Sequence, residues 1–221
     1  MDFLIVHRRL FILNVTSLAV FLWFAFLVTR GTQPMFDVWV FAARSVFSSD
    51  ALLRIMGAIS LVLHPFVLLV ETVIIFLVLL FFHKKRYAFL LLGAMTGGLL
   101  SSVLLKLAFG IARPLGGVPV IGHSFPSGHA TGATIFLLTI FFLIEKKVSD
   151  KTLHFLLCLV VLGLVILTGA SRLYLGVHWA SDVVAGFALG MFWITLASVS
   201  YTHLRAHETK ANLVCRLLLE K

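Results

Sequence analysis

Charged residues and cysteines are scarce in this sequence. Charged residues make up 12% of its 221 positions and apolar residues 61%, whereas about 25% of a soluble domain is charged. This composition excludes an ordinary soluble domain and indicates an integral membrane protein. Only two cysteines are present, Cys158 in an apolar run and Cys215 near the C-terminus, so no framework of disulfide bonds is indicated.

Long apolar runs fill most of the chain. Because a span needs about 20 residues, the length allows one bundle of about six spans and leaves no room for a soluble domain. The fold class that we expect is all-α, a six-transmembrane-helix bundle in a single domain over residues 1–198. The length of the second span suggests either a tilt or a kink at Pro65. The expected spans are 10–29, 55–82, a third from 87 to about 106, then 129–144, 152–170 and 182–198.

Two connecting segments are too interrupted to cross a bilayer. Residues 111–125 contain the prolines and glycines that are typical of an irregular loop. Residues 30–54 mix polar and apolar residues and favour a short helix lying on the membrane surface. The apolar residues of that surface helix are Phe36, Trp39, Val40 and Phe47.

Small and polar residues inside the spans favour contacts between helices. His64 and Glu71, seven positions apart in the second span, share a helix face. We favour a structural contact for them over a part in substrate handling, because a polar group in a span usually faces the bundle interior. Glycines allow two helices to approach closely. The glycines interpreted in this way are Gly93, Gly97, Gly98, Gly186 and Gly190.

The last segment, residues 199–221, departs from this Phe-rich pattern. It fits neither a span nor a patterned amphipathic helix, and it resembles the in-frame translation of a sequencing-library adapter. We interpret it as a non-native tail and exclude it from fold reasoning. The alternative is a native basic tail.

Positive charge indicates the orientation. The net charge is +9, and in a membrane protein an excess of Lys and Arg marks cytoplasmic loops, so we expect no nucleic-acid partner. Both termini are then cytoplasmic, and the loops after the third and fifth spans share the outer face. This arrangement predicts a multi-pass protein of the inner (cytoplasmic) membrane. One side holds Arg8, Arg9, Lys84, Lys85, Arg86, Lys146, Lys147 and Lys151, against Arg30, Arg44 and Arg54 on the other.

Two polar stretches open the fourth and sixth spans at that outer face. Residues 124–130 read SFPSGHA, and residues 171–182 read SRLYLGVHWASD. Ser127, Gly128 and His129 at a helix start offer a hydroxyl, backbone N–H groups and an imidazole at the positive end of the helix dipole. We therefore expect the two stretches to face each other across one phosphate.

Charged groups gather at the same depth. Lys106, Arg113 and Arg172 supply three cations, which can balance a phosphate dianion and a transition state without any metal. His178 precedes Asp182 by one helical turn, so the carboxylate can accept from one ring nitrogen and leave the other to attack phosphorus. His129 then fits the role of general acid towards the leaving oxygen. Charged groups in a membrane protein are functional candidates by default.

Three motifs resemble one family. Lys106 with Arg113-Pro114 fits K-x6-R-P, residues 126–129 read P-S-G-H, and residues 171–182 fit S-R-x5-H-x3-D. Together they resemble the type 2 phosphatidic acid phosphatase (PAP2) superfamily of lipid phosphatases, with core motifs in residues 87–198. The soluble vanadium haloperoxidases of that superfamily differ from this chain in having no spans.

The resemblance implies roles for the motif residues. His178 would form a phosphohistidine, oriented by Asp182, and His129 would protonate the leaving group and later activate water. The phosphate would be held by Lys106, Arg113, Ser127, Gly128 and Arg172.

The function implied is that of a membrane lipid phosphatase without metal or other cofactor. The substrate is a membrane lipid with a phosphomonoester or diphosphate end. Undecaprenyl diphosphate is favoured, ahead of phosphatidylglycerol phosphate, phosphatidate or lipid A phosphates. The alternatives are a lipid phosphotransferase that uses the same phosphohistidine and a non-enzymatic lipid-binding or transport protein. Nothing in the sequence indicates an oligomeric state.

Overall fold

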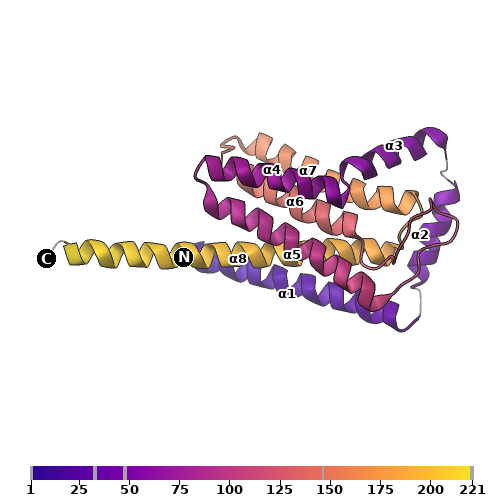
Figure 1. Cartoon of the computed structure of the whole chain (residues 1–221), viewed down its shortest axis with the longest axis horizontal. Coiled ribbons are helices and arrows are strands. Elements are labelled where there is room, and N and C mark those ends of the chain that lie inside the picture. The colour runs from indigo at the N-terminus through magenta and orange to yellow at the C-terminus, as the bar shows by residue number, and fades with distance from the viewer. Residues whose placement is uncertain (1, 32–33, 47–48, 146, 220–221) are drawn as a thin grey trace.

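The computed structural model describes residues 2–31, 34–46, 49–145 and 147–219, and every regular element in these ranges is a helix. The chain therefore has the all-α fold that its composition predicts (Figure 1). The helices are α1 (Asp2–Thr29), α2 (Met35–Val46), α3 (Asp50–Val62), α4 (Pro65–Phe81), α5 (Lys85–Phe109), α6 (Gly128–Glu145), α7 (Lys151–Tyr174) and α8 (Ala180–Leu219).

Within the described residues, six helical segments are long and apolar enough to cross a membrane, which confirms the predicted number. The second of them combines α3 and α4, and the last is the first half of α8. The segments are Arg8–Thr29, Asp50–Phe81, Lys85–Phe109, Gly128–Glu145, Lys151–Tyr174 and Ala180–Val199.

The second span is broken where a kink was expected. α3 ends at Val62, and α4 begins at Pro65 after His64, whose Nδ1 accepts a hydrogen bond of 3.2 Å from the Phe66 N–H. Proline suits this first helical position because it has no N–H to leave unpaired. His64 is therefore the N-cap of α4, at a break in the middle of a span.

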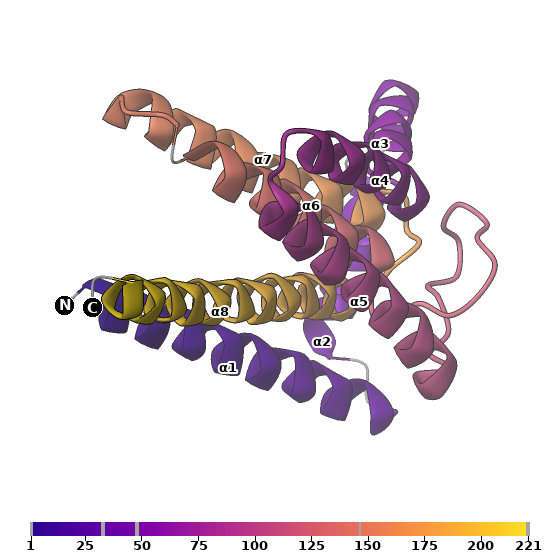
Figure 2. The same cartoon turned by 60° about the vertical axis from the view of Figure 1, so that its left-hand side comes forward.

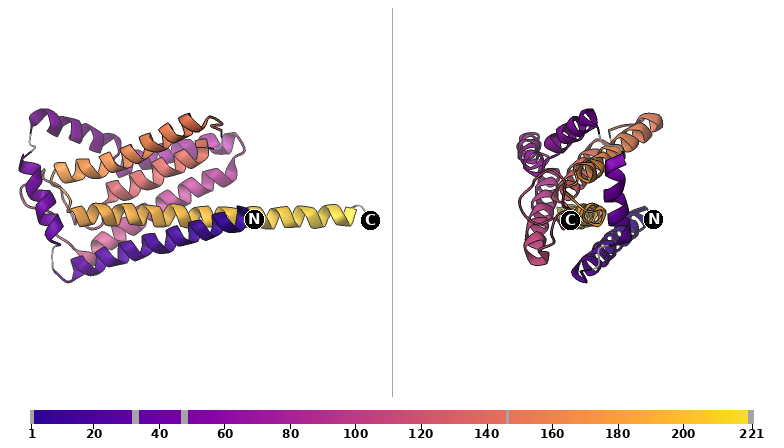
Figure 3. Two further views of the ribbon diagram at one scale, coloured as in Figure 1. Left: turned by 180° about the vertical axis from the view of Figure 1, so that it is seen from behind. Right: turned by 90° about the vertical axis from the view of Figure 1, so that its right-hand side faces the viewer.

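The surface helix predicted in residues 30–54 corresponds to α2, which lies across one end of the bundle (Figures 1 and 3). It contains Phe36, Trp39 and Val40, whereas Phe47 lies outside the described residues. Trp39 and Val40 are exposed, as expected of a helix at an interface. Residues 50–54 belong to the second span, because Ser49 caps α3 and that helix starts at Asp50.

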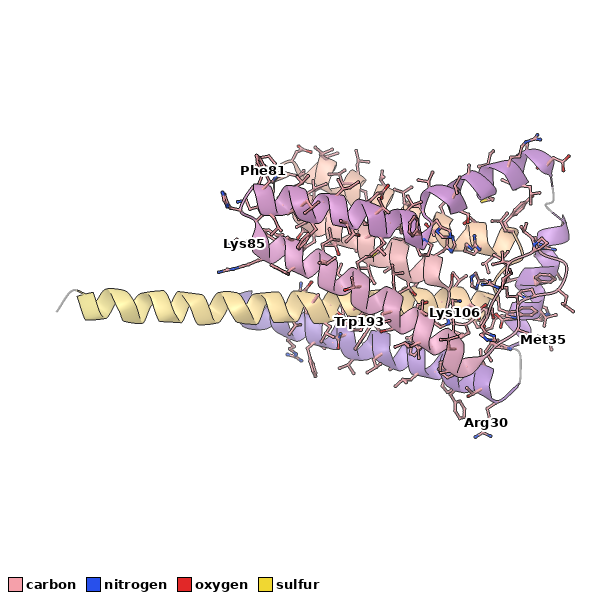
Figure 4. The ribbon with its side chains drawn as sticks, in the orientation of Figure 1. Arg30, Met35, Phe81, Lys85, Lys106 and Trp193 are labelled. Carbon is pink, nitrogen blue, oxygen red and sulfur yellow. The ribbon has the colours of Figure 1, made fainter. Side chains whose placement is uncertain are left out.

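α1 begins and α8 ends on the side of the bundle away from α2 (Figure 1). Figure 4 shows Phe81 and Lys85 towards that same side, whereas Arg30, Met35 and Lys106 lie towards α2. α8 continues as one helix through Leu219, although the pattern of residues 199–221 fits no span or amphipathic helix. No proline or glycine interrupts it there. The interpretation of this segment as non-native stays a prediction.

Glycines let α8 and α5 pack closely against their neighbours. A Cβ atom on Gly186 would lie 2.6 Å from the Ser127 carbonyl oxygen, and one on Gly190 would lie 2.9 Å from that of Thr131. Gly97 and Gly98 similarly meet side chains of α8 and α6. The packing prediction is wrong for Gly93, where a Cβ atom would have no neighbour within 4 Å. α8 also lies beside α1 (Figure 2).

We expect Gly186→Ala to lower the free energy of unfolding by about 1–3 kcal/mol, because the new methyl group would press on backbone atoms that cannot rotate away. Gly93→Ala is the matched control on an open helix face, where it should raise stability by about 0.5–1 kcal/mol through helix propensity. Thermal unfolding in detergent measures both. Equal midpoints for the two variants would contradict the close α6–α8 approach.

Candidate active site

The two polar stretches meet at the α2 end of the bundle. The backbone N–H of Ser127, at the start of α6, donates to the carbonyl oxygen of Asp182 in the first turn of α8 over 3.0 Å. From α5, Lys106 Nζ donates to the carbonyl oxygens of His123 (3.0 Å) and Ser124 (2.8 Å). The loops that follow the third and fifth spans therefore join into one site, as the sequence predicts.

Backbone contacts continue this junction. The Val118 N–H donates to the Leu175 carbonyl oxygen over 3.0 Å. Gly117 and Gly176 touch, since a Cβ atom on Gly117 would overlap the Gly176 carbonyl group. Gly176 also has φ +66°, a left-handed conformation that costs glycine little. Two glycines thus allow the loop before α6 to lie directly on the turn before α8.

His178 lies in that turn and is 3% exposed. Its Nδ1 is 3.3 Å from Asp182 Oδ2, and its Nε2 is 3.3 Å from an Arg113 NH group. Asp182 Oδ2 also accepts a hydrogen bond of 2.8 Å from the Trp179 N–H, which fixes the orientation of the carboxylate. Because a carboxylate only accepts, the ring proton is assigned to Nδ1, and the Nε2 lone pair faces the guanidinium.

The surroundings keep this imidazole neutral. Burial is the main cause that lowers the pKa of His178 well below its usual value, and the charges of Lys106, Arg113 and Arg172 lower it further. A neutral imidazole has a free lone pair on one ring nitrogen. An imidazole in this form is able to act as a nucleophile at neutral pH.

Arg113 binds both loops. Its Nε donates to the Gly122 carbonyl oxygen (3.0 Å), and its two terminal nitrogens donate to those of Val177 (2.6 Å) and His123 (3.1 Å). Burial lowers the pKa of Arg113, although an arginine side chain remains charged at any ordinary pH. The guanidinium of Arg113 thus holds the two loops around His178 and also places a positive charge beside that ring.

His129 and Arg172 come together through a hydroxyl group. The Arg172 NH1 group donates to Ser60 Oγ, and that oxygen lies 3.5 Å from His129 Nε2. His129 is 9% exposed and Arg172 is 6% exposed. The Arg172 Nε atom is buried and has no hydrogen-bond partner in the described part of the chain. An unpaired donor of this kind is what a bound oxyanion would satisfy.

Ser127 and Gly128 occupy the start of α6. The Ser127 hydroxyl is buried and accepts 3.4 Å from the Ala130 N–H, so it caps the helix. A Cβ atom on Gly128 would lie 3.5 Å from Ser102 Oγ and 3.8 Å from Pro65. α6 therefore begins against the break in the second span.

Sequence reasoning did not identify two residues that support the site, Asp37 and Ser60. Asp37, in α2, is 1% exposed, and its two carboxylate oxygens each accept 2.7 Å from Ser181, one from the N–H and one from the hydroxyl. Burial is the main cause that raises the pKa of Asp37. The one signal was an acidic residue in a mostly apolar surface helix, since nothing local links position 37 to position 181.

The remaining histidines near the site differ in role. The ring of His64 packs edge-on against that of His129, with centroids 5.0 Å apart. The carbonyl oxygen of His123 accepts a hydrogen bond from Lys106, and the side chain of His123 is exposed. Glu71, the other polar residue of the second span, has no hydrogen-bond partner among the residues that the structure describes.

Comparison with known proteins points to one family. A family model described as the PAP2 superfamily matches residues 86–205, more than half of the chain. A crystal structure of a transmembrane PAP2-type phosphatidylglycerolphosphate phosphatase from Bacillus subtilis superposes with a TM-score of 0.72. The two are 26% identical, and the match covers 82% of this chain and 94% of the other.

Curated relatives match shorter regions. Phosphatidylglycerophosphatase B of Bacillus subtilis is 38% identical over 31% of this chain and 34% of its own length. Undecaprenyl-diphosphatase of Sulfolobus acidocaldarius is 41% identical over 35% of this chain and 32% of its own. Lipid A 1-phosphatase of Rhizobium etli is 32% identical over 52% of this chain and 50% of its own. The chain thus spans about a third to a half of the length of these relatives.

We expect Asp37→Ala to destabilise the fold by about 1–3 kcal/mol, because it leaves two buried donors of Ser181 unpaired. Asp37→Asn should retain most of the stability, since an amide can still accept from the N–H and bond to the hydroxyl. Thermal unfolding in detergent measures the loss, with Asp50→Ala as the control for an exposed carboxylate. A change no larger in Asp37→Ala than in Asp50→Ala would contradict this contact.

Proposed function

Because the chain belongs to the PAP2 superfamily, we propose that it is a membrane phosphatase acting on a lipid that ends in a phosphomonoester or a diphosphate. The supporting observation is the setting of His178, with Nδ1 towards Asp182 and Nε2 towards Arg113. This arrangement holds the proton on the nitrogen that faces the carboxylate. It directs the other nitrogen to where a cation would hold a phosphoryl oxygen.

In the first step, His178 Nε2 attacks phosphorus. A P–N bond forms while the bond from phosphorus to the leaving oxygen breaks, and His129 gives its proton to that oxygen. Asp182 stabilises the positive charge that develops on the attacking ring. The products are a phosphohistidine and the dephosphorylated lipid.

In the second step, water attacks the phosphohistidine. A P–O bond forms, the P–N bond breaks, and His129 takes a proton from the water, which restores its starting state. Inorganic phosphate then leaves. The same imidazole thus acts first as acid and then as base, as microscopic reversibility requires.

The cations hold the phosphoryl oxygens during both steps. Arg172 brings an Nε donor that is unpaired in the described structure. Among the described residues, Lys106 binds carbonyl oxygens, and Arg113 binds carbonyl oxygens and His178. Three positive groups suit the charge of a phosphoryl transition state, which is spread over several oxygens. The Gly128 N–H at the start of α6 adds a donor at the positive end of a helix dipole.

The substrate class follows from the fold and the relatives. A site at one end of a six-span bundle lets a lipid bring its headgroup to the cations while its chain stays in hydrocarbon. The named relatives act on phosphatidylglycerophosphate, undecaprenyl diphosphate or lipid A, and we propose a lipid of this class, with undecaprenyl diphosphate favoured. The charge count favours cytoplasmic termini in an inner membrane and a site that faces outwards.

We expect His178→Ala to reduce phosphate release by about 10⁴-fold or more, because it removes the atom that bonds to phosphorus. The measurement is free phosphate from purified, detergent-solubilised protein with a lipid diphosphate or phosphatidate. EDTA should not reduce the wild-type rate, because the proposed chemistry uses three protein cations.

The control is His154→Ala, a histidine on α7 near Glu145, at the end of the bundle away from the site. It should keep the wild-type rate. Phosphate release without a lipid acceptor separates hydrolysis from phosphotransfer. Full turnover by His178→Ala would rule out the assigned nucleophile, and no release by the wild type from any phospholipid would exclude a phosphatase.

The pH profile of kcat/KM tests the electrostatics of His178. Attack requires the neutral ring, so activity is lost as pH falls through the pKa of His178, which lies well below 6.5. Removing a nearby cation relieves part of this lowering, so the acid limb of Arg113→Ala should move to higher pH. The titration of the substrate is common to both proteins and cancels in the comparison. Identical acid limbs would show that Arg113 does not act on this imidazole.

A further inference from the structure

His64 presents an unused hydrogen-bond donor beside the candidate general acid. Its Nδ1 accepts the Phe66 N–H over 3.2 Å, so in the neutral ring the proton sits on Nε2. No hydrogen bond to that Nε2 atom is found in the described residues, and the side chain is exposed. The ring therefore has one nitrogen fixed by the protein and one N–H available to a ligand.

The position of this donor is set by His129. The two rings meet edge to face, with centroids 5.0 Å apart and an interplanar angle of 89°. His64 is also the N-cap of α4, so the end of that helix with positive partial charge lies at the same place. A group bound beside the His129 ring would thus also be near the ring of His64.

A proton relay does not explain this contact. In the proposed mechanism His129 loses a proton in the first step and regains one from water in the second. The catalytic cycle therefore returns His129 to its starting state without a second imidazole. We therefore consider a role for His64 in binding the leaving group.

On the basis of the proposed function, we propose that His64 binds the second phosphoryl group of a lipid diphosphate. Adjacent phosphoryl groups share one bridging oxygen, which is the oxygen that His129 would protonate. The second phosphorus is then next to His129, and its non-bridging oxygens can accept from His64 Nε2. In a phosphomonoester the corresponding atom is carbon, which offers this N–H no acceptor. His64 is therefore a specificity-determining residue that favours diphosphates.

The test compares two substrates of equal chain length, an isoprenyl diphosphate and the corresponding isoprenyl monophosphate. His64→Ser keeps an acceptor at the N-cap of α4, because serine is a preferred N-cap residue, but lacks the distal N–H. The ratio of kcat/KM for diphosphate to that for monophosphate should fall about tenfold or more, the effect of losing one hydrogen bond to a charged group.

His154→Ala, whose ring also packs on an aromatic neighbour but far from the site, should keep the wild-type ratio. Thermal unfolding shows whether His64→Ser is folded, and His64→Asn provides a second variant that keeps the cap. An unchanged ratio, or an equal loss on both substrates in the folded variants, would overturn the proposal. The proposed function fails separately, since it requires only that the wild type releases phosphate.

Discussion

The site depends on the contact between the start of α6 and the first turn of α8, where the Ser127 N–H donates to the Asp182 carbonyl oxygen. It joins the first residues of two spanning helices that lie far apart in the sequence. One turn further along α8, Gly186 lies directly against the Ser127 carbonyl oxygen. Both backbone groups of Ser127 are therefore in contact with α8. Because of this contact, the start of α6, which carries His129, and the turn that carries His178 lie together at the end of the bundle.

The same junction explains why most polar groups of the site are buried. Lys106 and Arg113 bind carbonyl oxygens of the loop before α6. The Lys106 bond satisfies the carbonyl group of Ser124, a buried residue whose backbone would otherwise be unpaired away from water. The cations thus have a structural part in this state of the protein. A phosphate that enters must compete with these carbonyl oxygens, and as an anion it is the stronger acceptor.

The helices and the motif residues could be predicted from sequence because both signals are local. Apolar runs mark spans, and the spacing of His178 and Asp182 places them one helical turn apart. The count of Lys and Arg residues predicted that the two loops lie on the same side of the membrane. The contact between the loops confirms that they lie on the same side. The break at Pro65 was also expected, because proline acts on its own turn of helix.

The supporting residues could not be predicted, because their roles arise from distant contacts. Asp37 caps α8 although it belongs to α2, and Ser60 meets Arg172 across 112 positions of the chain. Neither residue is part of a motif, and each alone would pass for an ordinary polar residue. For Gly93 the sequence predicted a helix contact that the structure does not have. Its spacing matched a packing glycine, but only the tertiary arrangement decides which face of α5 meets another helix.

The Ser60 hydroxyl has one proton to give, and this couples two groups that differ in charge. Arginine can only donate, so the Ser60 oxygen accepts from Arg172 and its own proton is left for His129 Nε2. When that nitrogen itself carries hydrogen, the hydroxyl must rotate and accept from both neighbours. Each change in the protonation of His129 is thus accompanied by a reorientation beside Arg172. In the proposed mechanism, the binding of phosphate by Arg172 and the protonation of His129 would therefore be linked through the rotation of one O–H group.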